Sequence, residues 1–532
     1  MNKTVQRLLH YLPIILIALA LLAFIGYFVI YNIYAFALFR FPFDYDQGEG
    51  FELVDTVLFS RFQWPYRNND VFPFYSSNYP PVYHLAIVPL IWIFGPKYWT
   101  GRIVSYLGTL VTAAVISYAV QRKVKRWWLA VICGLAYLAS NYIYHVGPLF
   151  RQHLFMVMFE TLAVVMVAVI YEIEDRTGKK LNRWLMVAMA LLLLAGYTKQ
   201  LAYASVISVF GFMLLRDWRR TIRWALPFGF ITGMIFGYLT FFTNGEWFTA
   251  TVTANINEFI PGQAAGLFWQ WFRLHRIMAL VAGCYFFYQL YFERLSVYSI
   301  WWVLATVNSL TAGKWGAGES YFATAIAASC ILMGFGFGRI LNNTHKHPIR
   351  HQLALAAVAL LLLNQADRVF HMPTHTPTLR NVARMLGKPT ETYVAPQTGC
   401  SADRPAQIVS YVDTVGPTLL GRPPSLDDRV AGDRILSLLG SRGLVFSEEA
   451  AFNIWAGRPV VTNPTQLYNL AKNEAVDLTQ MLDMLNKKKF HHVVFRGQLF
   501  PGEVLYTIGQ NYHQTHLVEM NGFVYCIYGP NQ

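Results

Sequence analysis

Long apolar runs follow one another from residue 11 to residue 368 and are separated by short polar segments. Most are long enough to cross a bilayer as a helix, at residues 11–39, 98–120, 127–145, 150–172, 184–198, 200–215, 222–242, 272–292, 296–312, 319–340 and 351–368. A further apolar segment, 81–95, is short and contains Pro81 and Pro89, so we expect it to lie in the membrane interface without crossing. The pattern predicts an all-α polytopic membrane domain with about eleven transmembrane helices and additional juxtamembrane helices.

Basic residues occur in short clusters between the apolar runs and predict how the helices are oriented. Lys3 and Arg7 precede the first run, which is too long for a signal-peptide core, so we interpret it as a retained transmembrane helix. The positive-inside rule places the N-terminus in the cytoplasm together with the other basic clusters, at residues 122–126, 176–183, 216–223, 294 and 339–350. The outer face then holds four loops, at residues 40–97, 145–151, 243–271 and 312–320.

After residue 368 the chain becomes proline-rich and irregular, and short strands then alternate with helices. We expect strands at residues 443–447, 459–462, 492–495 and 522–528 and helices at 448–456 and 477–489. The chain therefore divides into a membrane domain, residues 1–368, and a small extracytoplasmic α/β domain, residues 369–532. Cys400 and Cys526 are the only cysteines of the second domain, and the sequence leaves open whether they form a disulfide.

Composition and charge support a membrane protein. Of the 532 residues, 55% are hydrophobic and only 14% are charged, which is too apolar for a soluble protein of this size. The formal net charge of +14 comes from clusters scattered between apolar runs, and these do not make the continuous basic surface of a nucleic-acid-binding protein. We expect an integral membrane protein whose surroundings are the lipid bilayer and which has no nucleic-acid partner.

An acidic segment directly follows the first apolar run, where the chain leaves the membrane on the predicted outer side. It begins at Asp44, and Asp46, Glu49, Glu52 and Asp55 then recur every third residue, so neighbouring pairs share a face if the segment is helical. Two carboxylates on one face could remove a proton from a hydroxyl group or hold a cation. The alternative is a solvated loop surface.

Further motifs lie in the predicted outer loops and at the ends of the flanking helices. They are Asn78-Tyr79-Pro80-Pro81-Val82-Tyr83-His84, Phe94-Gly95-Pro96, Gly101-Arg102-Ile103-Val104-Ser105, Tyr197-Thr198-Lys199-Gln200, Asn244-Gly245-Glu246, Asn255-Ile256-Asn257 and Gly313-Lys314-Trp315-Gly316. With the acidic segment, they resemble bacterial members of the GT-C glycosyltransferases, in the branch that contains the protein O-mannosyltransferases and the lipid A aminoarabinose transferase. The resemblance covers residues 10–340 and, beyond them, only Ser447-Glu448 and Ala456-Gly457-Arg458-Pro459-Val460.

The resemblance implies a membrane glycosyltransferase of a bacterial-type plasma membrane. Such an enzyme transfers a sugar from a polyprenyl-phosphate donor to an acceptor at the outer face, with inversion and with a carboxylate of the first outer loop as base. It implies no cofactor, and it leaves metal dependence open, because some GT-C enzymes use a divalent ion whereas the branch resembled here generally does not. Asp44, Asp46 and Glu49 offer oxygen ligands for a divalent cation, but the outer face has no second acidic cluster, so we expect no metal.

The chain departs from the family pattern at three places. Protein mannosyltransferases carry Asp-Glu where this chain has Asp46-Gln47, which leaves open how Asp46 and Glu49 divide the catalytic work. Related bacterial chains often have an acid after the arginine of the second outer loop, whereas this chain reads Arg151-Gln152-His153. The tip of the last outer loop reads Gly318-Glu319-Ser320-Tyr321 where the family has Asn-Tyr, which leaves its sugar or acceptor contacts open.

From these motifs we predict a site on the outer face. Asp46 is the general base, because it comes first in the resembled motif and lies nearest the end of the first helix, and Glu49 is its orienting partner or substitute. The two lie three residues apart, and the glycines at positions 48 and 50 let the backbone come close to a substrate. Basic residues on the outer side, where the positive-inside bias should remove them, are expected to hold the phosphate leaving group. The predicted substrate-binding residues are Asp44, Tyr79, Arg102, Arg151, His153, Lys199, Gln200, Lys314 and Glu319.

Two other classes of protein remain alternatives. A transporter or flippase of lipid-linked sugars would share the helices and the basic pocket, but it should show internal repeats, and none is evident in the sequence. A non-catalytic assembly protein would not need acids and bases on one face. The sugar, the prenyl chain length and the acceptor, whether protein, lipid or glycan, are not determined by the sequence.

Overall fold

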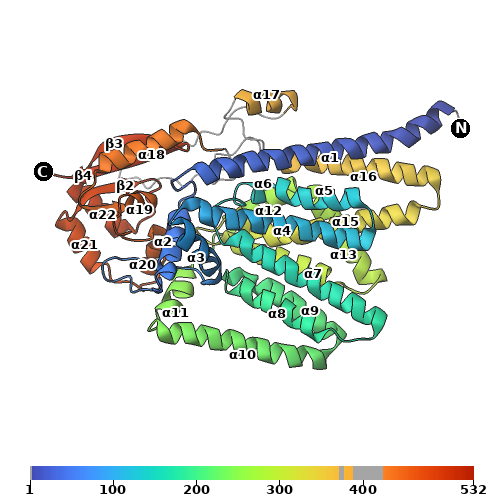
Figure 1. The fold of residues 1–532 in the computed structure, drawn as a ribbon, viewed down its shortest axis with the longest axis horizontal. Coiled ribbons are helices and arrows are strands. Elements are labelled where there is room, and N and C mark those ends of the chain that lie inside the picture. The colour runs from blue at the N-terminus through green and yellow to red at the C-terminus, as the bar shows by residue number, and fades with distance from the viewer. Residues whose placement is uncertain (1–2, 371–376, 388–422) are drawn as a thin grey trace.

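A helical bundle occupies one end of the molecule and a small mixed domain the other, in a computed structural model that describes residues 3–370, 377–387 and 423–532 (Figure 1). Each predicted apolar run contains an α-helix. The bundle helices are α1 (Lys3–Arg40), α4 (Tyr98–Val124), α5 (Trp127–Ala139), α7 (His153–Thr177), α8 (Asn182–Gly196), α9 (Tyr203–Arg216), α10 (Trp218–Phe242), α13 (Arg276–Phe292), α14 (Val297–Asn308), α15 (Ala323–Thr344) and α16 (Pro348–Val369).

The lengths of these helices fit a membrane protein. Among the described residues, six helices are long and apolar enough to cross a membrane, and five further apolar helices are 10–17 residues long. The all-α membrane domain is therefore confirmed, whereas the exact number of crossings stays a prediction. One short apolar helix is the segment expected to lie in the interface, which forms α3 (Val82–Phe94).

Helix α15 is buried along most of its length and packs against α4 through two glycines. A Cβ atom on Gly334 or Gly338 would lie 2.6 Å and 2.5 Å from methyl groups of Val120 and Val124. Small residues four apart allow this close approach of helices in a membrane. Helix α10 shows the opposite pattern, because it exposes large apolar side chains such as Phe230, as expected of a helix that faces lipid.

Three of the predicted cytoplasmic loops meet at one end of the bundle. Arg122 in the last turn of α4 pairs with Glu172 near the end of α7 at 3.0 Å, and Arg220 at the start of α10 pairs with Glu174 at 2.5 Å. Arg216 at the end of α9 lies 3.5 Å from Asp175. These ion pairs place three of the basic clusters, at residues 122–126, 176–183 and 216–223, at the same end of the bundle. Which compartment this end faces stays a prediction.

Short helices make up most of the opposite end. They are α2 (Glu49–Ser60), α3, α6 (Asn141–Tyr144), η1 (Gln200–Ala202), α11 (Glu246–Thr251), η2 (Thr253–Asn255), α12 (Pro261–Leu274), η3 (Ser309–Gly313) and η4 (Glu319–Phe322). Figure 1 shows α2, α3 and α11 between the long helices and the C-terminal domain. The loops carrying the predicted site residues therefore form the layer on which the C-terminal domain rests.

The C-terminal domain is a four-stranded sheet with helices around it, as the alternating pattern predicted. The strands have the order β1-β2-β4-β3, with β1 and β2 parallel and the other two pairs antiparallel. The elements are α18 (Leu426–Leu439), β1 (Leu444–Ser447), α19 (Ala451–Trp455), α20 (Pro464–Lys472), α21 (Thr479–Asn486), β2 (Phe490–Phe495), α22 (Gly502–Asn511), β3 (Tyr512–Met520) and β4 (Phe523–Pro530). Helix α17 (Pro377–Met385) lies apart from the sheet (Figure 1).

Several details of this domain differ from the prediction, which did not include helices α18, α20 and α22. The strand expected at 459–462 is wrong, because only Thr462 pairs there, in a single bridge with Phe74 of the first outer loop. Strand β3 was not predicted, because it is a mostly exposed edge strand whose polar residues give no apolar signal. The pairing of Cys400 with Cys526 lies outside the described residues.

The C-terminal domain binds the outer loops through many polar contacts. Trp455 donates its indole N–H to the carbonyl oxygen of Pro42 at 2.6 Å, and Asn463 donates to Asn78 at 3.2 Å. Trp315 stacks on Tyr468 with ring centroids 4.4 Å apart. Two loops far apart in the sequence, 40–97 and 312–320, are therefore held against one surface, which restricts access to the residues beneath.

Candidate active site

The acidic segment lies between α1 and α2, directly beneath the C-terminal domain. Asp46 precedes α2, and Glu49 is the first residue of that helix, with its N–H donating to the Asp46 carbonyl oxygen at 3.0 Å. The two side chains nevertheless bind different arginines. The short spacing in sequence therefore produces two separate ion pairs.

Glu49 and Arg102 form the inner pair, and both side chains are fully buried. The guanidinium donates from Nε to Glu49 Oε1 at 2.9 Å and from Nη2 to Oε2 at 2.8 Å. Its other N–H groups donate to the carbonyl oxygens of Leu38, Phe41 and Phe43. Because a guanidinium has five N–H groups, no donor is left for a phosphate. The predicted role of Arg102 in substrate binding does not fit this geometry.

The Glu49 carboxylate is saturated as well. It also accepts the backbone N–H groups of Tyr45, Asp46 and Phe150, the last at 2.7 Å. These bonds tie the acidic segment to the start of α4 and to the loop before α7. Glu49 therefore orients the segment that carries Asp46, which is one of its two predicted roles, and its buried oxygens are not placed to receive a proton from a substrate.

Asp46 and Arg151 form the outer pair, and about a quarter of each side chain is exposed, 23% and 24%. Arg151 donates from Nη2 and Nε to Asp46 Oδ2 at 2.6 Å and 2.9 Å. Burial by itself would raise the pKa of Asp46, but the positive charges of Arg151 and of Arg496 in the C-terminal domain outweigh burial and lower the pKa. Asp46 is therefore an ionised carboxylate that remains partly accessible.

Gly48 makes room for the Arg151 guanidinium. A Cβ atom at position 48 would lie 2.2–2.5 Å from its Nη1, Nη2 and Cζ atoms, which is too close for any side chain. The backbone φ of Gly48 is −107°, so the glycine is needed for space and not for an unusual conformation. Gly48, which was expected to let the backbone approach a substrate, instead lets the Arg151 guanidinium approach the backbone.

Asp44 has a connecting role in the structure. Its buried carboxylate accepts the Tyr98 hydroxyl at 3.0 Å, the Ala451 N–H of the C-terminal domain at 2.9 Å, and the Gly50 N–H. Burial and the nearby Glu449 carboxylate raise the pKa of Asp44. These contacts join the first outer loop to the C-terminal domain, and they leave Asp44 little opportunity for the predicted contact with substrate.

Lys199 lies over two aromatic rings, close enough to the outer pair to interact electrostatically with Arg151. Its ammonium is 3.1 Å from His153 Nδ1 and 5.1 Å from the ring centroids of both Tyr79 and Tyr321. Burial, with the nearby charge of Arg151, lowers the pKa of Lys199 to about 7. The structure thus brings together Lys199, His153 and Tyr79, which the sequence predicted to bind substrate.

Glu319 pairs with His145 across the same region, with Oε1 2.7 Å from Nε2. Burial alone would lower the pKa of His145, but the Glu319 carboxylate outweighs it and raises the pKa. The charge of His145 also lowers the pKa of Asp46, so this pair lies within electrostatic reach of the outer pair. His145 was not predicted, because a lone histidine in a loop gives no signal in the sequence.

The two remaining predicted residues lie at the edge of this group. Gln200 donates its amide N–H to the carbonyl oxygens of Thr251 and Asn78, at 3.0 Å and 3.5 Å, so it joins two outer loops. The backbone of Lys314 forms a bridge with Phe259, and no contact of its side chain with the outer pair is found among the described residues. The contacts of Gln200 and Lys314 therefore do not place either residue at the Asp46 carboxylate.

A third group of acids lies behind the outer pair. Glu52 and Asp55 of α2 and His84 of α3 are all buried and converge, with His84 Nε2 at 3.4 Å from Glu52 Oε2 and at 3.8 Å from Asp55 Oδ2. Burial raises the pKa of Glu52 to about 8 and that of Asp55 to about 7. The other oxygen of Glu52 lies 3.8 Å from Arg151, so this group adjoins the outer pair.

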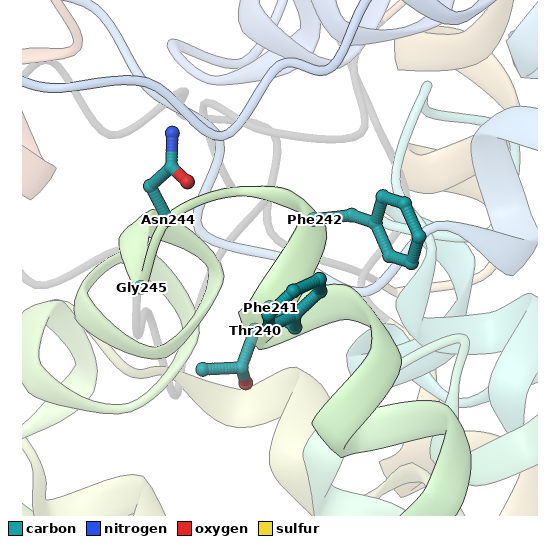
Figure 2. A pocket seen from close by; sticks show the side chains of 5 residues that line it. All are labelled: Thr240, Phe241, Phe242, Asn244 and Gly245. Carbon is teal, nitrogen blue, oxygen red and sulfur yellow. The ribbon is translucent and has the colours of Figure 1, made fainter.

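A separate cavity of about 460 Å³ lies at the end of α10, lined by Thr240, Phe241, Phe242, Asn244 and Gly245 (Figure 2). It includes two residues of the Asn244-Gly245-Glu246 motif. None of the lining side chains carries a charge or a titratable group. The cavity therefore offers no chemistry of its own, and the ionised groups at the outer pair remain the candidate active site.

Comparisons with known proteins find one family and several solved structures that are similar to this chain. The family described as "Dolichyl-phosphate-mannose-protein mannosyltransferase" matches residues 78–247, a stretch that includes Arg151 and Lys199 but not Asp46. No curated protein gives a significant match. Solved structures of ArnT from Cupriavidus metallidurans are similar: the form bound to undecaprenyl phosphate has a TM-score of 0.54 and 12% identity over 95% of this chain and 97% of that chain.

A second kind of structure is also similar. The Archaeoglobus fulgidus oligosaccharyltransferase in the apo form has a TM-score of 0.51 and 12% identity, over 91% of this chain and 69% of that chain. At this identity the likeness establishes the fold. The chain is thus a polytopic membrane protein with the fold of the GT-C superfamily of glycosyltransferases, as the motifs suggested.

Proposed function

We propose that this protein is a glycosyltransferase that transfers a sugar from a polyprenyl-phosphate donor to an acceptor at the outer face of the membrane. The observation that carries the proposal is the partly open Asp46–Arg151 pair beside Lys199, in a GT-C fold. The solved ArnT structure with undecaprenyl phosphate adds support, because its fold is similar to this one. An ionised carboxylate next to two cations matches the needs of this reaction, which removes a proton and releases a phosphate anion.

In this reaction the carboxylate of the pair acts on the acceptor, and the arginine acts on the leaving group of the donor. Asp46 accepts the proton of the acceptor hydroxyl while the hydroxyl oxygen attacks the anomeric carbon of the donor. The bond between that carbon and the phosphate oxygen breaks, and both its electrons leave with the lipid phosphate. Arg151 and Lys199 stabilise the departing anion. One displacement of this kind inverts the configuration of the sugar.

Arg151 also links donor binding to the strength of the base. In the free protein its charge lowers the pKa of Asp46, which makes this carboxylate a weak base. A donor phosphate that binds Arg151 shares this positive charge and so raises the basicity of Asp46. The base is therefore strongest when the donor is in place, and unproductive proton transfer in its absence is limited.

The proposal is tested with the full-length protein in liposomes and radiolabelled undecaprenyl-phosphate sugars. Envelope lipids, peptides and glycans are offered as separate acceptors, and the Asp46→Asn variant is the matched control. Label that moves to one acceptor class with the wild type and not with the variant supports the transferase. Label that crosses the bilayer while remaining on the prenyl phosphate would identify a flippase and contradict the proposal.

A further inference from the structure

The group formed by Glu52, Asp55 and His84 has an unusual feature that the transfer reaction does not explain. Glu52 Oε2 and His84 Nε2 are buried, face each other at 3.4 Å, and have no hydrogen-bond partner among the residues that the structure describes. Asp55 Oδ2 lies 3.8 Å from the same nitrogen. One ligand atom from each of the three side chains lies within 4.8 Å of the others, so all three point toward a common centre.

Hydrogen bonding shows that Nε2 is an acceptor. The Thr56 hydroxyl donates to the Glu52 carbonyl oxygen at 2.8 Å, so its single proton is used. Thr56 Oγ1 must therefore accept the bond that joins it to His84 Nδ1 at 3.1 Å, which places the imidazole proton on Nδ1. The lone pair of Nε2 then faces two carboxylate oxygens. Three acceptors around one buried point repel each other unless a proton or a metal cation lies between them.

We propose that Glu52, Asp55 and His84 form a binding site for a divalent transition-metal cation of the Zn²⁺ type. Two carboxylates and a neutral imidazole balance a dication without net charge, which suits a buried site. Imidazole and carboxylate are ordinary zinc ligands. Thr56 holds the other ring nitrogen, as partners of metal-binding histidines commonly do.

The distances favour a metal ion over a shared proton. Zinc bonds of about 2.0–2.2 Å place the ligand atoms of a tetrahedral site about 3.3–3.6 Å apart. The two separations from His84 Nε2, 3.4 Å and 3.8 Å, lie near this range. A proton shared between Glu52 and His84 would draw the two atoms together to about 2.7–2.9 Å. The observed separations from His84 Nε2 to the two carboxylate oxygens are longer than a hydrogen bond and close to the separations between ligand atoms around one zinc ion.

The site would connect three parts of the first outer loop. Glu52 and Asp55 belong to α2 and His84 to α3, while Asp55 Oδ1 also accepts the Tyr75 hydroxyl at 2.6 Å from the segment between them. The free oxygen of Glu52 faces Arg151. The bound ion would therefore act as a positioning element for the candidate active site, without touching the sugar or the phosphate.

Metal content and Zn²⁺ titration test the proposal. The full-length protein without an affinity tag is purified, treated with a chelator and titrated with Zn²⁺ by calorimetry, and X-ray absorption at the zinc edge reports the ligands. We expect about one equivalent per chain with imidazole and oxygen ligands. His84→Gln should weaken Zn²⁺ binding by more than about 100-fold, because losing a metal ligand costs more affinity than losing a residue that only hydrogen-bonds a ligand. Thr56→Val should weaken it by about 10–100-fold.

The matched control is His345→Ala, which removes an exposed histidine whose ring lies 5.3 Å from that of His351. Binding that persists in His345→Ala and is lost in His84→Gln supports the site. Binding that shows the reverse pattern is surface binding only and overturns the proposal, as does a wild-type protein with no saturable Zn²⁺ binding. If His84→Gln does not fold, Asp55→Asn and the absorption spectrum of the wild type decide. None of these readouts requires transferase activity, so the two proposals fail separately.

Discussion

The two arginine–carboxylate pairs, Glu49–Arg102 and Asp46–Arg151, differ in burial and in how many of their hydrogen-bonding groups are already used. This difference distinguishes a structural pair from one that is able to bind a substrate. In the inner pair, every N–H group of Arg102 is used and both side chains are fully buried. In the outer pair, Arg151 and Asp46 bind each other while about a quarter of each remains exposed. The inner pair fixes the loop, whereas the outer pair has capacity left for a substrate.

The difference also teaches how neighbouring acids acquire separate roles. Asp46 and Glu49 are three residues apart, at the start of the same helical turn. The buried pair of Glu49 has all its hydrogen bonds satisfied and resists change, whereas the partly exposed pair of Asp46 can exchange partners. Glycine at position 48 permits the outer pair by admitting the Arg151 guanidinium. The following variants test this division.

The largest expected effect belongs to Asp46→Asn. The amide keeps the shape of the side chain but does not accept a proton, so kcat should fall by about 10²–10⁴. The apparent Tm in detergent should change little, because the pair is partly exposed. Single-turnover transfer and thermal unfolding measure the two quantities. Near-normal turnover in Asp46→Asn would show that another group is the base.

Glu49→Gln should act on stability instead. It leaves the buried Arg102 charge without its partner, which costs about 3–5 kcal/mol for pairs of this kind. We expect a clearly lower apparent Tm than in Asp46→Asn, with nearly normal kcat per folded molecule. A Glu49→Gln protein with normal thermal stability and no activity would reverse the roles given to the two acids.

Gly48→Ala tests the space beside Arg151. The new methyl group would lie 2.2 Å from Nη1, so the guanidinium must move away from its present position. A displacement of about 1 Å in a reacting group can lower the rate by about 10²-fold, and we expect a loss of that order in kcat/KM. Gly26→Ala is the control, because nothing lies within 4 Å of a Cβ at that position. Equal activity in both variants would contradict the importance of the Arg151 position.

Lys199→Ala should chiefly weaken donor binding. A hydrogen bond to a charged group contributes about 1.5–3 kcal/mol, so the donor KM should rise by about tenfold or more while the fold stays intact. Steady-state kinetics with varied donor concentration separates KM from kcat. An unchanged donor KM and kcat would make Lys199 a structural lysine held between two aromatic rings.

The smallest effect is a pH dependence of the same lysine. Because the pKa of Lys199 is lowered to about 7, its positive charge is present below this pH and is lost above it. The kcat/KM for the donor should therefore decline as the pH rises through 7. Lys199→Arg keeps its charge throughout this range and should remove the decline. A decline of equal size in Lys199→Arg would assign it to another group.

Much of the fold could be predicted from the hydrophobic pattern. The membrane helices and the α/β character of the C-terminal domain depend on local sequence, because a span must be apolar along its whole length. Strand β3 was missed because its side chains are largely exposed, and the strand at 459–462 failed because its residues meet the first outer loop and not the sheet. Only the second error concerns a segment whose partner lies far away in the chain, because β3 pairs with the adjacent strand β4.

The candidate site also has some features that the sequence predicted and others that only the structure revealed. The sequence by itself determined that Asp46, Glu49, Arg102, Arg151 and Lys199 belong together on one face, because charged residues near a membrane surface are costly and are retained for a purpose. It did not determine which arginine binds which acid, or that Glu52, Asp55 and His84 converge. Only the tertiary structure decided these points, because ion pairing and burial depend on distances between loops that the sequence does not specify.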